Sequence, residues 1–231
     1  MWCVKLHTTS SYAAQLRPLL RNQVFRPAPQ RLVWLPVHYA VVIASGLVIA
    51  RGWLPWPAQL ALSVLMGASF AGLTFVAHEA LHGSIVRSRG LRRVIGQLGF
   101  LPFCVPTRLW EAWHNRVHHG HTNHPGSDPD AYPTLAEYED SRAVRWVTDW
   151  VAPGRGRAGG GFSLLVGFSV QSSHMLMTAA RRGFLSRGQH RLALLESGLS
   201  WAAWIAVASV VGPSPLCWSS ACRCWWPTRS S

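Results

Sequence analysis

Two uncharged apolar runs, each long enough to cross a membrane, constrain the fold of this chain more than any other feature. The first covers residues 32–50 and the second covers residues 58–77. A helix rises about 1.5 Å per residue, so a run of this length spans nearly the whole of a bilayer core about 30 Å thick. The segment between them, residues 51–57, contains one Gly, two Pro and two Trp. That composition is typical of a tight turn at a membrane surface, and the pattern predicts a transmembrane helical hairpin.

The composition supports a membrane location. Only 13% of the residues are charged, whereas soluble domains average about 25%. The formal net charge of +13 would suit either nucleic acid or an anionic membrane surface. The 13 tryptophans favour the membrane, because Trp concentrates at membrane–water interfaces. We therefore expect an integral, multi-pass membrane protein and no nucleic-acid partner.

Two more apolar runs lie in the C-terminal half. Residues 162–180 include Gln171, Ser172, Ser173 and His174, and four arginines follow within residues 181–191. A span there would put those arginines outside the cell, against the charge rule, so we expect an amphipathic helix on the cytoplasmic face. Whether this run spans the membrane stays open. Residues 192–212 contain a single acidic residue and predict a third span.

Arginine counts beside the hairpin predict its orientation. The arm before it and the segment 87–93 carry four Arg each, while the turn carries one. Short cytoplasmic segments are enriched in basic residues, so both outer ends should face the cytoplasm. The expected fold is an all-α membrane protein, a transmembrane helical hairpin plus a third span with a cytoplasmic histidine-rich helical cap. Its parts are a basic cytoplasmic arm (1–31), the hairpin (32–77), the cap (78–191), the third span (192–212) and an aberrant tail (213–231).

The spacing of histidines indicates a metal site in the cap. Residues i and i+4 share one face of a helix, which suits two ligands to one ion. This spacing occurs twice, and burying neutral imidazoles costs free energy unless a metal or hydrogen bonds satisfy them. The sequence therefore predicts a metal centre formed by five ligands: His78, His82, His114, His118 and His119.

Further polar residues follow the second histidine group. Gly120 and the Asn-His-Pro-Gly stretch are expected to end the helix, which would put His121 and His124 in a loop. These two are candidates for outer contacts to the ligands. Asp128 and Asp130 have two alternatives, which are to orient ligand histidines or to cap the loop through Asx-turns.

Two kinds of metal site fit only parts of this pattern. The sequence from His78 to His82 reads H-E-x-x-H, as in zinc metalloproteases with a glutamate base, but this leaves the second histidine group unexplained. A carboxylate-rich di-iron bundle would use Glu79 and Glu111, but it needs two more inward glutamates. A non-catalytic metal-binding remnant is an alternative of another class.

The segments HEALHGS (78–84) and HNRVHHGHTNHPGSDPD (114–130) together resemble the membrane fatty acid desaturase family, whose superfamily includes hydroxylases and carotenoid ketolases. The resemblance is specific across residues 75–133. It implies a non-haem di-iron site on the cytoplasmic face, with two iron ions held by the five histidines. It also implies O₂ as co-substrate, a lipid acyl chain as substrate, and a ferredoxin-like or cytochrome-like electron donor. Desaturation and hydroxylation both stay open.

The sequence departs from the family after the second histidine group. The family has a third histidine box beyond its last span, and none occurs after His124. The tail CWSSACRCWWPTRSS (217–231) shows neither helical nor alternating periodicity. We interpret it as the product of a frameshift or premature end near Leu216, and we expect the chain as written to be an inactive fragment of an oxidoreductase.

Overall fold

The computed structural model describes residues 9–122, 124, 127, 128, 131, 133–151, 165–181 and 183–211. Every regular element in this part of the chain is helical, which confirms the expected all-α class. The tail from 213 and Asp130 lie outside the described residues. The helices are α1 Thr9–Leu16, α2 Trp34–Arg51, α3 Trp56–His82, α4 Arg89–Phe100, α5 Thr107–Trp110, the π-helix η5 Glu111–His118, α6 His119–His121, α7 Leu135–Asp140, α8 Arg142–Val151, the π-helix η6 Leu165–Gln171, α10 Ser172–Thr178 and α11 Arg187–Val211, with short 3₁₀ turns η1 Arg17–Leu19, η2 Asn22–Phe25, η3 Pro29–Val33 and η4 Leu101–Phe103.

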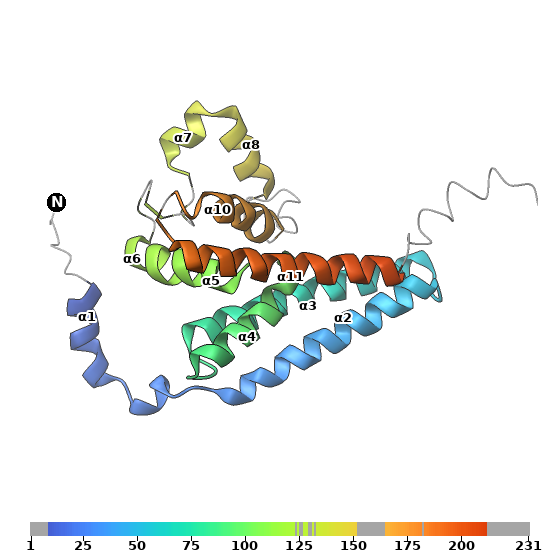
Figure 1. Ribbon diagram of the computed structural model, residues 1–231, viewed down its shortest axis with the longest axis horizontal. Helices are drawn as coiled ribbons and strands as arrows, with labels where there is room; N and C mark the ends of the chain where they lie inside the picture. Colours follow the sequence, from blue (N-terminus) through green and yellow to red (C-terminus); the bar gives the residue numbers. More distant parts are fainter. Residues whose placement is uncertain are drawn as a thin grey trace, which may run out of the picture.

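Three helical segments are long and apolar enough to cross a membrane. They are Asn22–Arg51, Trp56–His82 and Arg187–Val210, so the hairpin and the third span are present as candidates. The run 162–180 is not among them within the residues described; its visible part forms the short helices η6 and α10. In Figure 1 the α2–α3 turn and the end of α11 lie at one end of the molecule, and α6 lies at the other.

The hairpin turn follows from its glycine and prolines. Gly52 ends α2 with φ of 63°, a left-handed conformation that glycine adopts without steric cost. Pro57 stands in the first turn of α3, where a missing backbone N–H costs nothing. The guanidinium of Arg51 lies 5.4 Å from the ring centroid of Trp53, a cation–π contact at the turn.

Small residues bring α2 and α4 close to α3. A Cβ atom on Gly72 would clash with the ring of His38, and one on Gly99 would clash with the backbone carbonyl of Leu73. The Tyr39 hydroxyl adds a bond from α2 to α4, donating to the Leu98 carbonyl at 2.6 Å. Close approach on two sides holds α3, whose last turns carry the first histidine pair.

Helix α11 attaches through its one carboxylate. Glu196 accepts the backbone N–H of Arg108 at 3.0 Å and pairs with Arg108 Nε at 2.9 Å. Gln97 donates to the Glu196 carbonyl at 3.0 Å, and Trp204 Nε1 donates to the Pro102 carbonyl at 3.2 Å. These bonds dock α11 on α5 and α4, and they satisfy an acid that would otherwise be costly in an apolar helix.

Two helices extend beyond the predicted spans, and one histidine expected in a loop lies in a helix. Helix α3 continues without a break from residue 77 through His82, so the span and the first histidine pair share one helix. Helix α11 begins at Arg187 rather than at 192. The second histidine helix runs through Gly120, which places His121 in its last turn and not in a loop. A glycine costs a helix only about 1 kcal/mol relative to alanine, and the preceding helical turns offset that cost.

Candidate metal centre

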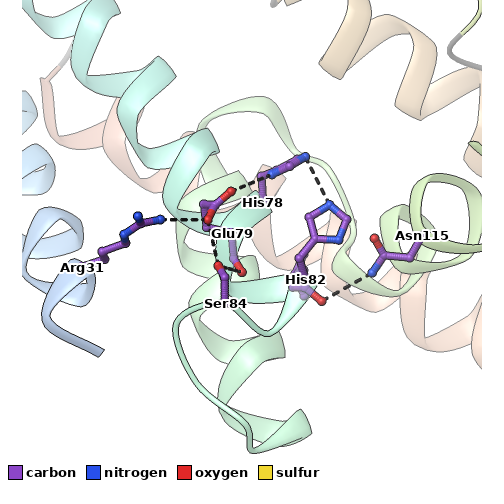
Figure 2. A network of polar contacts seen from close by, with 7 residues as sticks. Arg31, His78, Glu79, His82, Ser84 and Asn115 are labelled. Carbon is purple, nitrogen blue, oxygen red and sulfur yellow. Dashed lines mark hydrogen bonds and ion pairs between the residues drawn. The ribbon is translucent and has the colours of Figure 1, made fainter. Parts of the chain in front are cut away.

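The first histidine pair occupies the end of α3. His78 and His82 stand one turn apart, and their Nε2 atoms are 3.3 Å from each other. The helix stops at Gly83, whose φ of 81° is strained for any residue with a side chain. Figure 2 shows both imidazoles on the same side of the helix end. The local i, i+4 geometry that the sequence predicted is therefore present.

The second histidine group stands on a π-helical segment. Residues Glu111–His118 form η5. Such π-helical turns are rare in proteins, but where they occur they often lie at functional sites. The rings of His114 and His118 stack with centroids 4.8 Å apart. The ring of His119 turns away from this stack and lies 4.9 Å from His114. The group thus presents a stacked pair and a third imidazole beside it.

The structure brings the two histidine groups together. Ring nitrogens of His78, His82 and His114 all lie within 4.8 Å of one another. His119 joins them, with its ring centroid 4.9 Å from that of His82, and His118 lies 5.3 Å from His119. Metal–nitrogen bonds of about 2 Å place two ligands of one ion at most about 4 Å apart, so small ring rotations suffice for shared coordination. An all-imidazole donor set of this kind suits a transition metal such as iron, zinc, copper or nickel.

A buried tryptophan that the sequence reasoning missed supports three of these rings. Trp110 is 1% exposed. Its ring stacks on His114 at 4.4 Å, and it lies 5.3 Å from His78 and 5.4 Å from His82. Trp110 is four residues before His114, so helical spacing could have marked it as a neighbour of that ligand. It forms an apolar wall on one side of the histidine cluster.

One of the two aspartates contacts a histidine of the second group. The Asp128 carboxylate oxygens lie 2.9 and 3.0 Å from His118 Nδ1, and the Asp128 side chain is fully buried. A carboxylate in this position holds the proton on Nδ1 and directs Nε2 toward a metal. Asp130 lies outside the described residues. Of the two alternatives for Asp128, the geometry favours contact with a candidate ligand.

His121 and His124 are not among the three histidines whose ring nitrogens converge. Both are exposed, and their ring centroids are 6.5 Å from each other. His121 Nδ1 lies 3.3 Å from the Val117 carbonyl, a contact within its own helix. Their role as outer contacts to the ligands stays a prediction.

The glutamates are engaged in other contacts. Glu79 accepts a hydrogen bond from Ser84 Oγ at 2.8 Å and pairs with Arg31 Nη1 at 3.2 Å, as Figure 2 shows. Its other oxygen lies 3.7 Å from His78 Nδ1, so it can orient that ring. A zinc protease needs this glutamate as a free base.

The carboxylates required by a carboxylate-rich di-iron bundle are likewise paired with arginines. Glu111 binds Arg93 Nη2 at 2.7 Å, and Glu196 binds Arg108. Among the described residues, the one group of side chains that could converge on an ion consists of histidines. The geometry therefore favours an imidazole centre over either carboxylate-based alternative.

A known protein family matches most of this chain. Residues 51–227 match the family model described as fatty acid desaturase. Over 119 residues the chain is 36% identical to an sn-1 acyl-lipid omega-3 desaturase (ferredoxin) of Synechocystis sp., which covers 52% of this chain and 33% of that protein. It is 29% identical over 132 residues to dihydrorhizobitoxine desaturase of Bradyrhizobium elkanii, covering 54% and 36%.

A relative with a different activity also appears. Zeaxanthin 4-ketolase of Chlamydomonas reinhardtii is 27% identical over 153 residues, covering 55% of this chain and 33% of that protein. The chain spans about a third of the length of these curated relatives. No solved structure matches it.

Proposed function

Because the chain belongs to the fatty acid desaturase family, we propose that it is a membrane-bound non-haem di-iron oxidoreductase that oxidises C–H bonds of a lipid acyl chain with O₂. The family match and the desaturase relatives make it an oxidoreductase. The observation that carries the finer proposal is the convergence of His78, His82 and His114 at the end of a membrane-spanning helix, with His118 and His119 beside them.

The five histidines would hold two iron ions, which when bound supply the redox chemistry that activates O₂. The protein's own groups have separate tasks around them. Asp128 keeps the proton of His118 on Nδ1, so that Nε2 is free to bind metal. Glu79 lies 3.7 Å from His78 Nδ1, which is close enough for electrostatic attraction but too long for a hydrogen bond. Trp110 closes one wall of the cluster with an apolar surface, which excludes water there.

The position of the cluster suits a substrate that arrives from the bilayer. It lies in the last turns of α3, a helix whose apolar side chains include the exposed Phe75 only three residues before His78. An acyl chain in the outer bilayer region can therefore approach the cluster without leaving the membrane. A soluble electron donor of the ferredoxin or cytochrome kind would supply electrons from the aqueous side; the Synechocystis relative is named for ferredoxin.

The cluster would face the cytoplasm. This part of the proposal rests on arginine placement, because the arm before α2 and the segment after α3 are both rich in Arg. A cysteine introduced at the exposed position Arg87, shortly after α3, should then react with an impermeant reagent only in inverted vesicles. Labelling from the outside of intact cells would show that the orientation is the reverse of the one proposed.

Hydroxylation or ketolation of a lipid or carotenoid is the second candidate. The similarity to a zeaxanthin ketolase favours it, because the two reactions share the first hydrogen abstraction and diverge afterwards. A metal-binding protein without turnover is the remaining alternative.

Lipid analysis of a desaturase-deficient host distinguishes these activities. We would express the chain itself and a chimaera in which residues 213–231 are replaced by the corresponding C-terminal part of the Synechocystis desaturase. A new double bond in the acyl chains from the chimaera alone, with iron content near two per chain, supports the proposal and agrees with the expected inactivity of the chain as written. A new double bond from the chain itself supports the oxidoreductase and contradicts that expected inactivity. Hydroxylated or keto products support the second candidate. If both versions bind iron and the host lipids stay unchanged, the result supports a metal-binding protein without catalytic activity.

Replacing Asp128 with Asn is expected to weaken iron binding about 10- to 100-fold, because loss of a carboxylate behind a ligand histidine typically costs that much. The measurement is iron retention against a competing chelator. Asp149→Asn is the matched control, since Asp149 accepts a hydrogen bond from Tyr138 at 2.9 Å in the α7–α8 pair. Equal retention in both variants would show that Asp128 does not act on the metal.

A further inference from the structure

An arginine-rich cavity of about 340 Å³ opens beside the histidine helix, and none of the five clustered histidines lines it. Its wall comes from α3, α4, α5, η5 and α11. Six of its lining residues carry charge, namely Arg89, Arg92, Arg93, Arg108, Arg116 and Glu111. Five guanidinium groups against one carboxylate make the cavity strongly positive.

Two of the five arginines are neutralised and three are not. Arg93 pairs with Glu111, and Arg108 pairs with Glu196. Arg92 Nε donates to the Val86 carbonyl at 2.9 Å, and Arg116 Nη2 donates to the Phe184 carbonyl at 3.0 Å. Within the described residues, neither of these two nor Arg89 has an ion pair with a carboxylate.

Three like charges around one small cavity repel one another, so an anion bound among them would lower the free energy of the folded protein. Guanidinium groups bind phosphate through paired N–H donors, which makes a phosphate the best chemical match.

The cavity lies at the level where lipid headgroups are found. Leu81 in its wall belongs to the last turn of α3, and Gln189 belongs to the first turn of α11. Both helices are candidate membrane spans, so these ends mark the boundary between apolar core and water. A small anion anchored in the bilayer can therefore reach the cavity directly.

The size of the cavity favours a lipid headgroup over a larger ligand. The volume is at the small end of ligand sites, enough for a headgroup but not for an acyl chain as well. The side chains of the paired Arg93 and Arg108 are 22% and 24% exposed, whereas Arg89 and Arg116 are exposed, so a headgroup phosphate can reach these two from the membrane surface.

We propose that this cavity binds the phosphate of an anionic phospholipid headgroup, with Arg89, Arg92 and Arg116 as the cations that meet it. The site is distinct from the histidine cluster, although Arg116 is two residues from His114 on the same π-helix. Headgroup binding would therefore anchor that helix at the membrane surface. The proposal requires neither iron nor turnover, so its test is independent of the oxidoreductase function.

Binding of a water-soluble lipid to the detergent-purified full chain tests the proposal. The probe is dihexanoyl phosphatidylglycerol, read out by its effect on the thermal unfolding midpoint across a concentration series. We expect saturable stabilisation, and an apparent Kd at least tenfold weaker in the Arg89→Ala/Arg116→Ala double variant. Arg142→Ala is the control, because Arg142 is exposed on α8 and does not line the cavity. Its Kd should equal that of the unmodified chain.

Three outcomes would overturn the proposal. Equal affinity in the double variant and the control would show that the cavity is not the binding site. Inorganic phosphate binding as tightly as the lipid would identify free phosphate as the ligand. Binding of an acidic ferredoxin that is lost in the double variant, with no lipid binding by the unmodified chain, would make this a protein-docking surface. If the double variant does not fold, the exposed Arg89→Gln single variant replaces it in the same comparison.

Discussion

Replacing His114 with alanine is expected to weaken iron binding by more than about 100-fold, the largest effect of any single change in the centre. The ring of His114 lies 5.2 Å from His78 and 5.5 Å from His82, and it also contacts His118 and His119. Removing it therefore takes a ligand from the point where the two histidine groups meet. Losses behind a ligand already cost about 10- to 100-fold in affinity, and losing the ligand itself should cost more.

The measurement is iron per chain after purification and chelator challenge, together with stabilisation by added ferrous ion. A ligand at 100 times its Kd stabilises a protein by about 2.7 kcal/mol, and that stabilisation should nearly vanish in the variant. His190→Gln is the control, because His190 Nε2 lies 3.0 Å from the Leu176 carbonyl and glutamine retains a donor. Unchanged iron content in His114→Ala would remove the basis of the proposed centre.

Replacing Trp110 with alanine is expected to lower the free energy of unfolding by about 3–5 kcal/mol, the usual cost of emptying the space of a buried aromatic side chain. Trp110 is 1% exposed and contacts Phe100 at a ring distance of 5.4 Å. The same change removes the surface on which His114 stacks. Iron affinity should therefore fall together with stability.

Trp110→Phe separates the two effects, because it retains much of the packing and an aromatic face for His114. Chemical denaturation measures stability, and the chelator challenge measures iron retention. Trp146→Ala is the matched control, since Trp146 is 61% exposed on α8 and should change stability by less than about 0.5 kcal/mol. An iron affinity in Trp110→Phe as low as in Trp110→Ala would show that the full indole is required.

The local sequence pattern was sufficient to predict the candidate membrane helices and the spacing within each histidine pair. A lipid bilayer requires a continuous apolar run with internal hydrogen bonds, and that requirement is readable from residues 32–50, 58–77 and 192–212. Likewise, i and i+4 share a helix face whatever the rest of the chain does. The cytoplasmic orientation rests on arginine counts and stays a prediction.

Only the tertiary structure decided which side chains come together at the candidate metal centre. The first histidine pair faces the second because α4 packs tightly on α3 through Gly99, a contact between residues far apart in sequence that no local period encodes. Long-range packing likewise placed Trp110 beside His78 and His82 and joined Glu79 to Arg31. Such contacts depend on how helices pack, so the sequence alone could name the candidate ligands and Asp128, but not the pairing of Glu79 with Arg31 or the position of Trp110 beside the first histidine pair.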